Sequence, residues 1–184
     1  MITYANAKNF KSLRDIEFNL NKTKNKTNNF IAIYGENGSG KTNIVELFKF
    51  LQQLTMARVT DVLINKIPIE ISKRQEDIEE QLPREIKQLS LLSMNYNEYR
   101  MIDEKEPTEI KYGFKIDDKD GFYYIKFNDE VIEEKLYFLA GKQNGYLFEI
   151  TKQGEKINKS LNKNIFLNEQ YNKKLMEIID MYWG

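Results

Sequence analysis

The sequence contains neither cysteine nor histidine in its 184 residues. Without cysteine the chain forms no disulfide, carries no thiol nucleophile and offers no thiolate to a metal, which is compatible with a reducing compartment. Without histidine it also lacks the side chain that most often serves as a general base or metal ligand near neutral pH. Any chemistry therefore falls to carboxylates, lysines, hydroxyls and backbone groups.

An excess of positive charge is also missing. Lysine and arginine together number 28, aspartate and glutamate together number 28, and the formal net charge is zero. No global positive field favours nucleic acid, although a local basic patch, and with it DNA as a partner, stays open. No apolar run approaches membrane-spanning length and the N-terminus has no apolar signal core, so we expect a cytoplasmic protein without a membrane partner.

The most specific motif is a glycine-rich loop of the form G-x-x-x-x-G-K-T, the phosphate-binding P-loop. It comprises Gly35, Glu36, Asn37, Gly38, Ser39, Gly40, Lys41 and Thr42. The apolar residues 30–34 before it predict a strand buried on both faces. Apolar residues at helical spacing after it predict an amphipathic helix. A strand, a glycine loop and a helix N-terminus direct N–H groups and a positive dipole end at one anion, so the segment predicts a phosphate site.

Each residue type in the loop has a physical role in that prediction. The glycines can adopt positive φ and let the backbone approach phosphate without a Cβ in between. Lys41 is expected to reach the β- and γ-phosphates as a compact charge, and the Thr42 hydroxyl to ligate Mg²⁺. The alternative is a glycine-rich turn that joins a core strand to a helix and binds nothing.

The part of the chain around the loop divides into two segments. Residues 1–60 combine a hairpin at 2–20 with the P-loop strand and helix. Lys11 and Ser12 lie between the two strands of the hairpin, where the residues alone predict a solvated turn. Residues 61–107 are expected to be an insertion of helices and loops.

The remainder of the chain is predicted to be a sheet followed by a helix. Residues 108–155 alternate apolar and polar residues, which predicts an antiparallel meander of four strands. Its many aromatic residues allow two interpretations, a base-stacking platform or the packed face of the sheet, and the charge balance favours the second. Residues 156–184 begin as a polar irregular stretch and end in a helix with an apolar stripe, which favours a chain that continues or docks on a partner.

A hydrolytic P-loop enzyme also needs a carboxylate on Mg²⁺ and a residue that positions water. The usual carboxylate is an Asp at the end of four apolar residues on a buried strand. Asp117 and Asp129 instead end alternating stretches in hairpin turns, and Asp180 lies in the predicted helix. Glu36 and Asp180 stay open as substitutes, although nothing in their spacing favours them. The residues alone predict a phosphate cradle without the rest of a hydrolytic site.

Two stretches of the sequence resemble a bacterial ATPase family. The first is Asn9-Phe10-Lys11-Ser12-Leu13, followed by a strand with Ile16 and Phe18 and by residues 34–46. The second and looser stretch is Tyr123-Tyr124-Ile125-Lys126-Phe127 with Val131-Ile132-Glu133-Glu134-Lys135-Leu136. Both are similar to AAA-type, ABC/SMC-like head ATPases related to overcoming-lysogenization-defect and abortive-infection proteins. The resemblance implies a single α/β unit over residues 1–184, the N-terminal portion of a P-loop NTPase head, in which the P-loop strand and helix combine with the meander.

Carried over residue by residue, the resemblance implies that residues 35–42 and Asn43 bind ATP and Mg²⁺, with Lys41 as the catalytic lysine and Thr42 on the metal. It implies that Lys11 and Ser12 lie beside the nucleotide and that Asn37 orders the loop. In such ATPases two heads enclose ATP, and the Walker B acid and signature segment come later in the chain. This sequence has neither, so the resemblance implies a longer protein or a second ATPase half.

Three functions fit these observations. The first is the ATP-binding portion of an ATPase in phage defence or DNA maintenance, weak or inactive alone and completed by a second half, with a nuclease or another effector as a further partner. The second is a non-catalytic interaction module in which nucleotide sets a conformation. The third is a P-loop kinase, which the antiparallel meander disfavours because such enzymes need further parallel strands and a basic lid.

Overall fold

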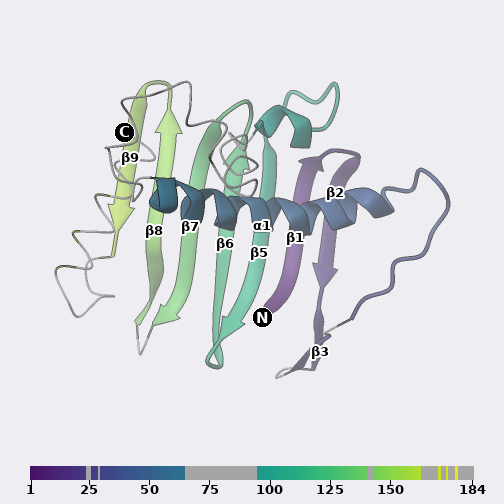
Figure 1. The fold of residues 1–184 in the computed structure, drawn as a ribbon, viewed down its shortest axis with the longest axis horizontal. Helices are drawn as coiled ribbons and strands as arrows, with labels where there is room; N and C mark the ends of the chain where they lie inside the picture. Colours follow the sequence, from purple (N-terminus) through teal and green to yellow (C-terminus); the bar gives the residue numbers. More distant parts are fainter. Residues whose placement is uncertain are drawn as a thin grey trace. The chain divides into compact units, whose positions relative to one another are not determined.

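The structure is a computed structural model, shown as a ribbon in Figure 1. It describes residues 1–23, 26–28, 30–64, 95–140 and 143–162, and beyond these only Gln170, Lys173 and Glu177. The chain divides into two compact units, Met1–Glu36 with Tyr96–Gly184 and Asn37–Asn95, and each is described by itself.

The first unit is built on a seven-stranded antiparallel sheet with the strand order β2-β1-β5-β6-β7-β8-β9 (Figure 1). The strands are β1 (Ile2–Phe10), β2 (Leu13–Asn19), β5 (Thr108–Ile116), β6 (Lys119–Phe127), β7 (Val131–Ala140), β8 (Gln143–Gln153) and β9 (Lys156–Leu161). The hairpin expected at 2–20 and the meander expected at 108–155 are both confirmed. A small separate ribbon of β3 (Asn21–Thr23) and β4 (Lys26–Thr27) follows the hairpin.

The start of the C-terminal segment differs from the expectation. Residues 156–184 were expected to begin irregularly and continue into a helix, but β9 is a strand that pairs with β8 from Gln153↔Lys156 to Phe148↔Leu161. Its inward positions include Lys159, so the apolar alternation that marks a half-buried strand is incomplete in the sequence. Pairing with β8 decides the conformation. Gln170, Lys173 and Glu177 are helical, and the rest of that predicted helix lies outside the described residues.

One face of the sheet carries the core of the first unit. Two rows of cross-strand neighbours form it, Ala7, Ile110, Ile125, Glu134 and Ile150 in one and Ala5, Tyr112, Tyr123, Leu136 and Phe148 in the other. Glu134 is buried in this face, and its Oε1 accepts a hydrogen bond of 2.8 Å from the Tyr123 hydroxyl. That bond offsets part of the cost of removing a carboxylate from water.

The opposite face of the sheet is charged. Asp15, Lys8, Glu109, Lys126 and Glu133 are successive cross-strand neighbours from β2 to β7 and alternate in sign. Lys126 Nζ lies 3.0 Å from Glu109 Oε1. Opposite charges on directly opposed residues favour their pairing, and a slip by one residue would turn every one of them toward the core face. The charge pattern thus helps to select the register.

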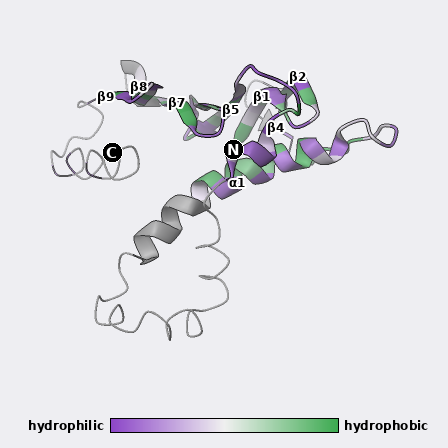
Figure 2. Cartoon of the chain, turned by 90° about the horizontal axis from the view of Figure 1, so that it is seen from above, coloured by the Kyte–Doolittle hydropathy of each residue, from purple (hydrophilic) through white to green (hydrophobic). Residues whose placement is uncertain are grey.

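The second unit contains α1 (Lys41–Ile64), the helix expected after the P-loop. Ile44, Leu47 and Phe50 are buried along it at three-residue spacing, and hydrophobic and hydrophilic residues interleave along its described turns (Figure 2). The helix continues past the boundary expected at residue 60, because residues 55–64 include no glycine or proline that would end it. Of the insertion expected at 61–107, residues 65–94 lie outside the described residues. No helix among the described residues is both long and apolar enough to cross a membrane.

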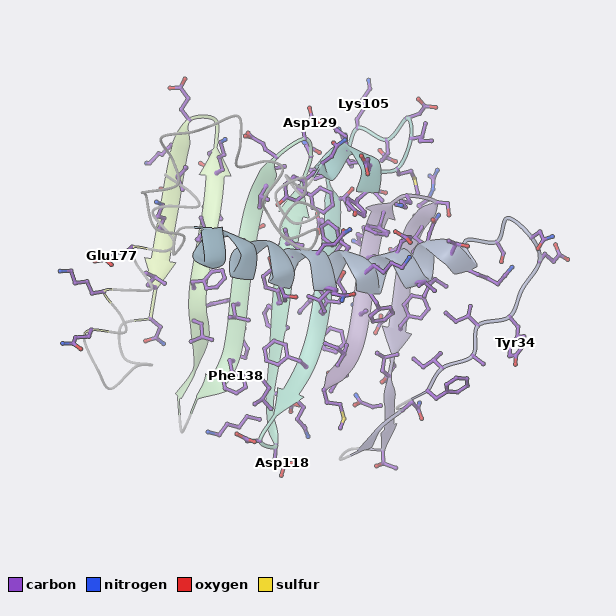
Figure 3. All side chains as sticks on the ribbon, in the orientation of Figure 1. Tyr34, Lys105, Asp118, Asp129, Phe138 and Glu177 are labelled. Atoms are coloured by element: carbon purple, nitrogen blue, oxygen red, sulfur yellow. The ribbon has the colours of Figure 1, made fainter. Side chains whose placement is uncertain are left out.

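The strand expected before the P-loop does not form in this structure. Residues 30–34 have no strand conformation, and Phe30 is 84% exposed, Ile31 47% and Tyr34 90%. Figure 3 shows Tyr34 on this segment, outside the strands of the sheet. A run that is apolar on both sides needs a strand on each edge and a cover on each face. The described strands pair only with one another, so they offer residues 30–34 no such place.

Candidate functional site

The glycine-rich loop has the backbone conformation that its sequence predicts. Gly38 and Gly40 have φ values of +84° and +88°, in the left-handed region that side chains disfavour. A Cβ added at Gly38 would meet no atom within 4 Å, so the backbone conformation and not the available space favours glycine there. The turn at residues 37–40 leads directly into α1, which begins at Lys41.

The start of α1 is arranged to suit an anion. The N–H of Ile44 donates to the Gly40 carbonyl (3.2 Å), so the first turn comprises Lys41, Thr42 and Asn43. N–H groups in a first helical turn have no acceptor within the helix, and they lie at the positive end of its dipole. The first turn of α1 has no acidic side chain that would compete for this position. Three N–H groups and a lysine therefore meet where a phosphate would bind.

The loop is open to a ligand. Gly35, Glu36, Asn37, Ser39 and Thr42 are all exposed. Glu36 ends the N-terminal segment of the first unit, and Asn37 is the first residue of the second unit. The described residues contain no group of three or more His, Cys, Asp or Glu side chains that could hold a metal. The hydroxyl of Thr42 fits the Mg²⁺ that accompanies a nucleotide, because this ion takes few protein oxygens besides phosphate and water.

Lys11 and Ser12 form the turn between β1 and β2 in the first unit, as expected for a hairpin. Lys11 has a φ of +50° and Asn9 one of +54°. Asparagine tolerates this region, whereas a left-handed lysine costs about 1–2 kcal/mol and persists only if its surroundings hold it. The Lys11 N–H donates to the carbonyl of Tyr99 (2.9 Å), a residue that sequence reasoning missed because nothing in its local pattern indicates the contact.

Comparison with known families identifies the domain. A family model described as "AAA domain, putative AbiEii toxin, Type IV TA system" matches residues 30–174. The chain belongs to this family. Its AAA domain is thus of the P-loop, nucleotide-binding, ATPase-like kind, and the match spans both the glycine-rich loop and the meander. No curated protein matches the chain.

The two described aspartates considered for Mg²⁺, Asp117 and Asp129, lie in exposed turns and not on the buried part of a strand. Asp117 is exposed in the β5–β6 turn with a φ of +48°. Asp129 is exposed in the β6–β7 turn, and its Oδ1 lies 2.9 Å from a guanidinium nitrogen of Arg100. Asp180 is outside the described residues. Asp117 and Asp129 therefore have ordinary roles, in a turn and in an ion pair.

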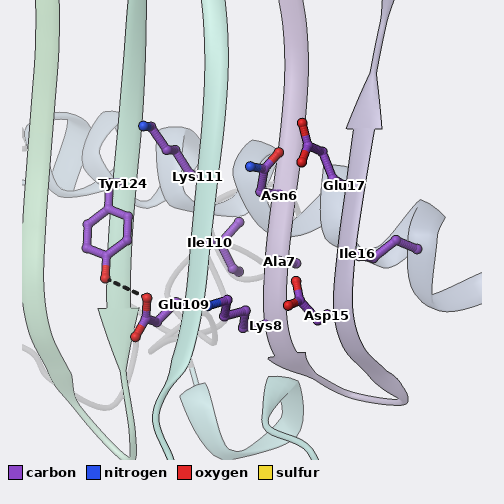
Figure 4. A pocket seen from close by; sticks show the side chains of 10 residues that line it. All are labelled: Asn6, Ala7, Lys8, Asp15, Ile16, Glu17, Glu109, Ile110, Lys111 and Tyr124. Atoms are coloured by element: carbon purple, nitrogen blue, oxygen red, sulfur yellow. Dashed lines mark hydrogen bonds between the residues drawn. The ribbon is translucent and has the colours of Figure 1, made fainter.

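The first unit also has an open hollow of about 300 Å³ on the charged face of its sheet (Figure 4). Its lining comprises Asn6, Ala7, Lys8, Asp15, Ile16, Glu17, Glu109, Ile110, Lys111 and Tyr124, none of them predicted to bind nucleotide. Burial opposes ionisation of Glu109, but Lys126 and the Tyr124 hydroxyl (3.1 Å) hydrogen-bond to the carboxylate and bring its pKa below the ordinary value. The hollow is a surface of mixed charge, in which the Glu109 carboxylate is already paired with Lys126.

Aromatic rings on the same face pack against one another. The rings of Phe122 and Tyr137 lie 5.1 Å apart and are nearly parallel, at 9°. Lys111 Nζ, from the other neighbouring strand, lies 4.1 Å from the centre of the Phe122 ring, and Tyr146 meets both rings edge-on. Phe122 thus has a neighbour from each flanking strand. This arrangement favours the packed-face interpretation over a base-stacking platform, which requires free ring faces.

Proposed function

We propose that this chain is the ATP-binding portion of an ABC/SMC-like ATPase. The observation that carries the proposal is the pair of left-handed glycines, Gly38 and Gly40, immediately before a long helix that begins with Lys41 and Thr42. The family match over residues 30–174 supports the same class of ligand. A glycine-rich turn without a ligand would need neither a lysine nor a hydroxyl at the first two helical positions.

Each residue of the site has a defined task in this proposal. The N–H groups of residues 38–43 surround the phosphates, Lys41 neutralises the β- and γ-phosphates, and the Thr42 hydroxyl ligates Mg²⁺. Lys11 and Ser12 lie beside the nucleotide. When bound, ATP supplies a phosphoanhydride bond whose cleavage releases energy, and Mg²⁺ neutralises charge on its phosphates. The chain itself binds and orients these groups.

We propose that a second polypeptide segment completes the catalytic site, from further sequence or from a partner that encloses ATP with this half. Hydrolysis needs a carboxylate on Mg²⁺ and a group that positions water, and Asp117 and Asp129 are exposed in hairpin turns. Residues 30–34 support the same idea, because an exposed apolar run beside the P-loop lacks the strands that would bury it. Such strands, ending in an acid, would cover the run and bring the missing carboxylate.

The family match supports a proposal for the biological setting. Its description names a toxin of a type IV toxin–antitoxin system, which supports a role in phage defence, with DNA maintenance as the alternative. We propose that the protein acts in the cytoplasm, where ATP is available, through an effector such as a nuclease. A balanced net charge gives no support to DNA as a direct ligand of this chain.

ATP binding is tested by thermal unfolding of the chain with Mg-ATP. At an ATP concentration of one hundred times Kd, binding adds about 2.7 kcal/mol of stability, which gives a clear rise in Tm. The variant Lys41→Ala should lose this rise. Lys49→Ala is the matched control, because Lys49 lies on the same helix and forms an exposed ion pair with Glu46 (2.8 Å). Absence of any Tm shift at millimolar ATP in the unchanged chain would contradict the proposal.

A second candidate function is a nucleotide-sensing module that never hydrolyses ATP. The exposed turn positions of Asp117 and Asp129 favour it for the described residues. The two candidates differ in one measurement, the release of phosphate after the completing segment or partner is added. Hydrolysis that appears only then supports the ATPase half, and binding without hydrolysis supports the sensing module.

A further inference from the structure

The glycine-rich loop contains an asparagine that is followed directly by a glycine, Asn37-Gly38. The main-chain nitrogen after an asparagine can attack the side-chain amide carbon, Cγ, and a Cβ on the following residue obstructs that approach. Glycine has no Cβ, so an asparagine that precedes glycine is the most open to this reaction. The same pair occurs at one other place in the chain, Asn144-Gly145, which allows a comparison.

The structure leaves the reacting groups of Asn37 and Gly38 unobstructed. Asn37 is exposed, and neither its side chain nor the Gly38 N–H has a hydrogen-bond partner among the described residues. A Cβ added at Gly38 would meet no atom within 4 Å, so the space around its main chain is open. The amide carbon of Asn37 and the nitrogen of Gly38 can therefore approach each other.

Asn144 and Gly145 lie in a different setting. They belong to β8 and pair with Leu139 and Phe138 of β7. Attack on Cγ requires the main chain to rotate at the asparagine, and a strand that is hydrogen-bonded to its neighbour resists that rotation. A Cβ at Gly145 would also lie 3.0 Å from the side-chain nitrogen of Asn162, so the space there is tighter. The same two residues are therefore held in β8 and open in the loop.

We propose that Asn37 is a site of spontaneous deamidation, that this change inactivates the phosphate-binding loop, and that bound ATP slows it. The Gly38 nitrogen bonds to Asn37 Cγ, the Cγ–N bond of the side-chain amide breaks, and ammonia leaves with the proton of the Gly38 N–H. Water then opens the cyclic imide. Cleavage at Cγ gives aspartate, and cleavage at the main-chain carbonyl gives isoaspartate. The net reaction consumes water, releases ammonia and requires no oxidant.

Both products are unsuited to a phosphate site. Each carries a carboxylate in place of the neutral amide, directly after Glu36, in a loop whose N–H groups suit an anion. Isoaspartate also adds a methylene group to the main chain, which changes the arrangement of the N–H groups that follow.

A bound nucleotide opposes the reaction. A phosphate oxygen that accepts the Gly38 N–H holds this nitrogen away from Cγ and keeps its proton in place. The two effects that involve ATP rest on the proposed function, whereas the deamidation itself does not.

The test stores the full chain at physiological temperature without nucleotide, with Mg²⁺ and a non-hydrolysable ATP analogue, and with Mg²⁺ and AMP. Mass spectrometry of the tryptic peptides 27–41 and 143–152 then detects the change from amide to carboxyl. Peptide 27–41 should acquire aspartate and isoaspartate at residue 37, and peptide 143–152 should stay unchanged. The ATP analogue should slow the change, and AMP should slow it much less because it lacks the β- and γ-phosphates.

Loss of binding is measured on the samples stored without nucleotide, as the capacity for a fluorescent ATP analogue. The capacity should fall by the fraction of chains modified at residue 37. Asn37→Gln is the control for the chemistry, because attack on the longer side chain must form a larger and less favoured ring. Relative to its own fresh sample, this variant should keep its capacity. Lys41→Ala should deamidate equally fast with and without the ATP analogue.

The outcomes separate this inference from the proposed function. If the fresh chain binds the ATP analogue but residue 37 changes no faster than residue 144, the inference is wrong and the ATP site stands. If residue 37 is modified while the capacity stays the same, or if bound analogue does not slow the change, the inference is also wrong. If the fresh chain binds no analogue, the proposed function fails and the inferred inactivation fails with it, while peptide 27–41 still shows separately whether Asn37 deamidates.

Discussion

Strand β5 and residues 30–34 are both rich in apolar and β-branched residues, yet only β5 has a hydrogen-bonded neighbour on each side. β5 lies between β1 and β6, and its Ile110 and Tyr112 are buried. Residues 30–34 have no strand conformation, and Phe30 and Tyr34 are almost fully exposed. The two stretches differ in the pattern of their apolar residues. They also differ in whether the described part of the chain supplies the strands that this pattern requires.

The difference shows what each kind of pattern needs. In β5 apolar and polar residues alternate, so one face suffices for burial, and the next strand, β6, follows after a two-residue turn. Residues 30–34 are apolar on both sides, so they need strands on two edges and a cover on two faces. The first requirement is met by β6, the next strand along the chain, on one edge and by β1 (Ile2–Phe10) on the other. The second depends on strands that do not come from the described residues.

The largest expected effect compares the same substitution in the two regions. Ile125→Ala removes a side chain that is 1% exposed and should destabilise the fold by about 2–5 kcal/mol. Ile31→Ala removes one that is 47% exposed and should change stability by less than about 0.5 kcal/mol. Urea unfolding of both variants measures the contrast. Equal losses would mean that residues 30–34 are buried in the isolated chain, contrary to the structure.

A smaller effect is expected at Gly113 in the centre of β5. A Cβ there would lie 2.0 Å from the ring of Tyr4, which crosses over the glycine. Gly113→Ala should cost about 1–3 kcal/mol through this overlap. In a Tyr4→Ala background the same change should become neutral or stabilising, because alanine is the better strand residue once the space is open. Identical losses in both backgrounds, measured by urea unfolding, would exclude the overlap as the cause.

The smallest effect concerns Glu109 on the charged face. Burial opposes its ionisation, but Lys126 and Tyr124 lower its pKa below the ordinary 4.5. A lowered folded-state pKa stabilises the fold above the unfolded-state pKa, and this contribution is lost as the pH falls through the folded-state value. Glu109→Gln should therefore cost about 0.5 kcal/mol or less at neutral pH, and this cost should disappear once the pH has fallen below the folded-state pKa. A stability difference that grows on acidification, measured by thermal unfolding, would contradict the assigned sign.

Much of the fold could be predicted from the sequence. Both exceptions depend on strand pairing, which the local sequence pattern does not show. The hairpin at 2–20, the meander and α1 follow from periodicity, because their partners or apolar faces lie within a few tens of residues. The sequence did not predict β9, because Lys159 interrupts its apolar alternation. Its pairing with β8 shows that it is a strand. The prediction of a strand at residues 30–34 was wrong, because an apolar run forms a strand only where a sheet is available to pair with it.

The residues predicted to bind nucleotide divide in the same way, as Gly40 and Lys11 show. The sequence by itself determined the loop conformation and the start of α1, because left-handed glycines and a helix N-terminus depend on residues only a few positions apart. Only the tertiary structure decided that Tyr99 holds Lys11 in a left-handed turn, because that conformation is unfavourable for lysine and persists through contacts from far along the chain.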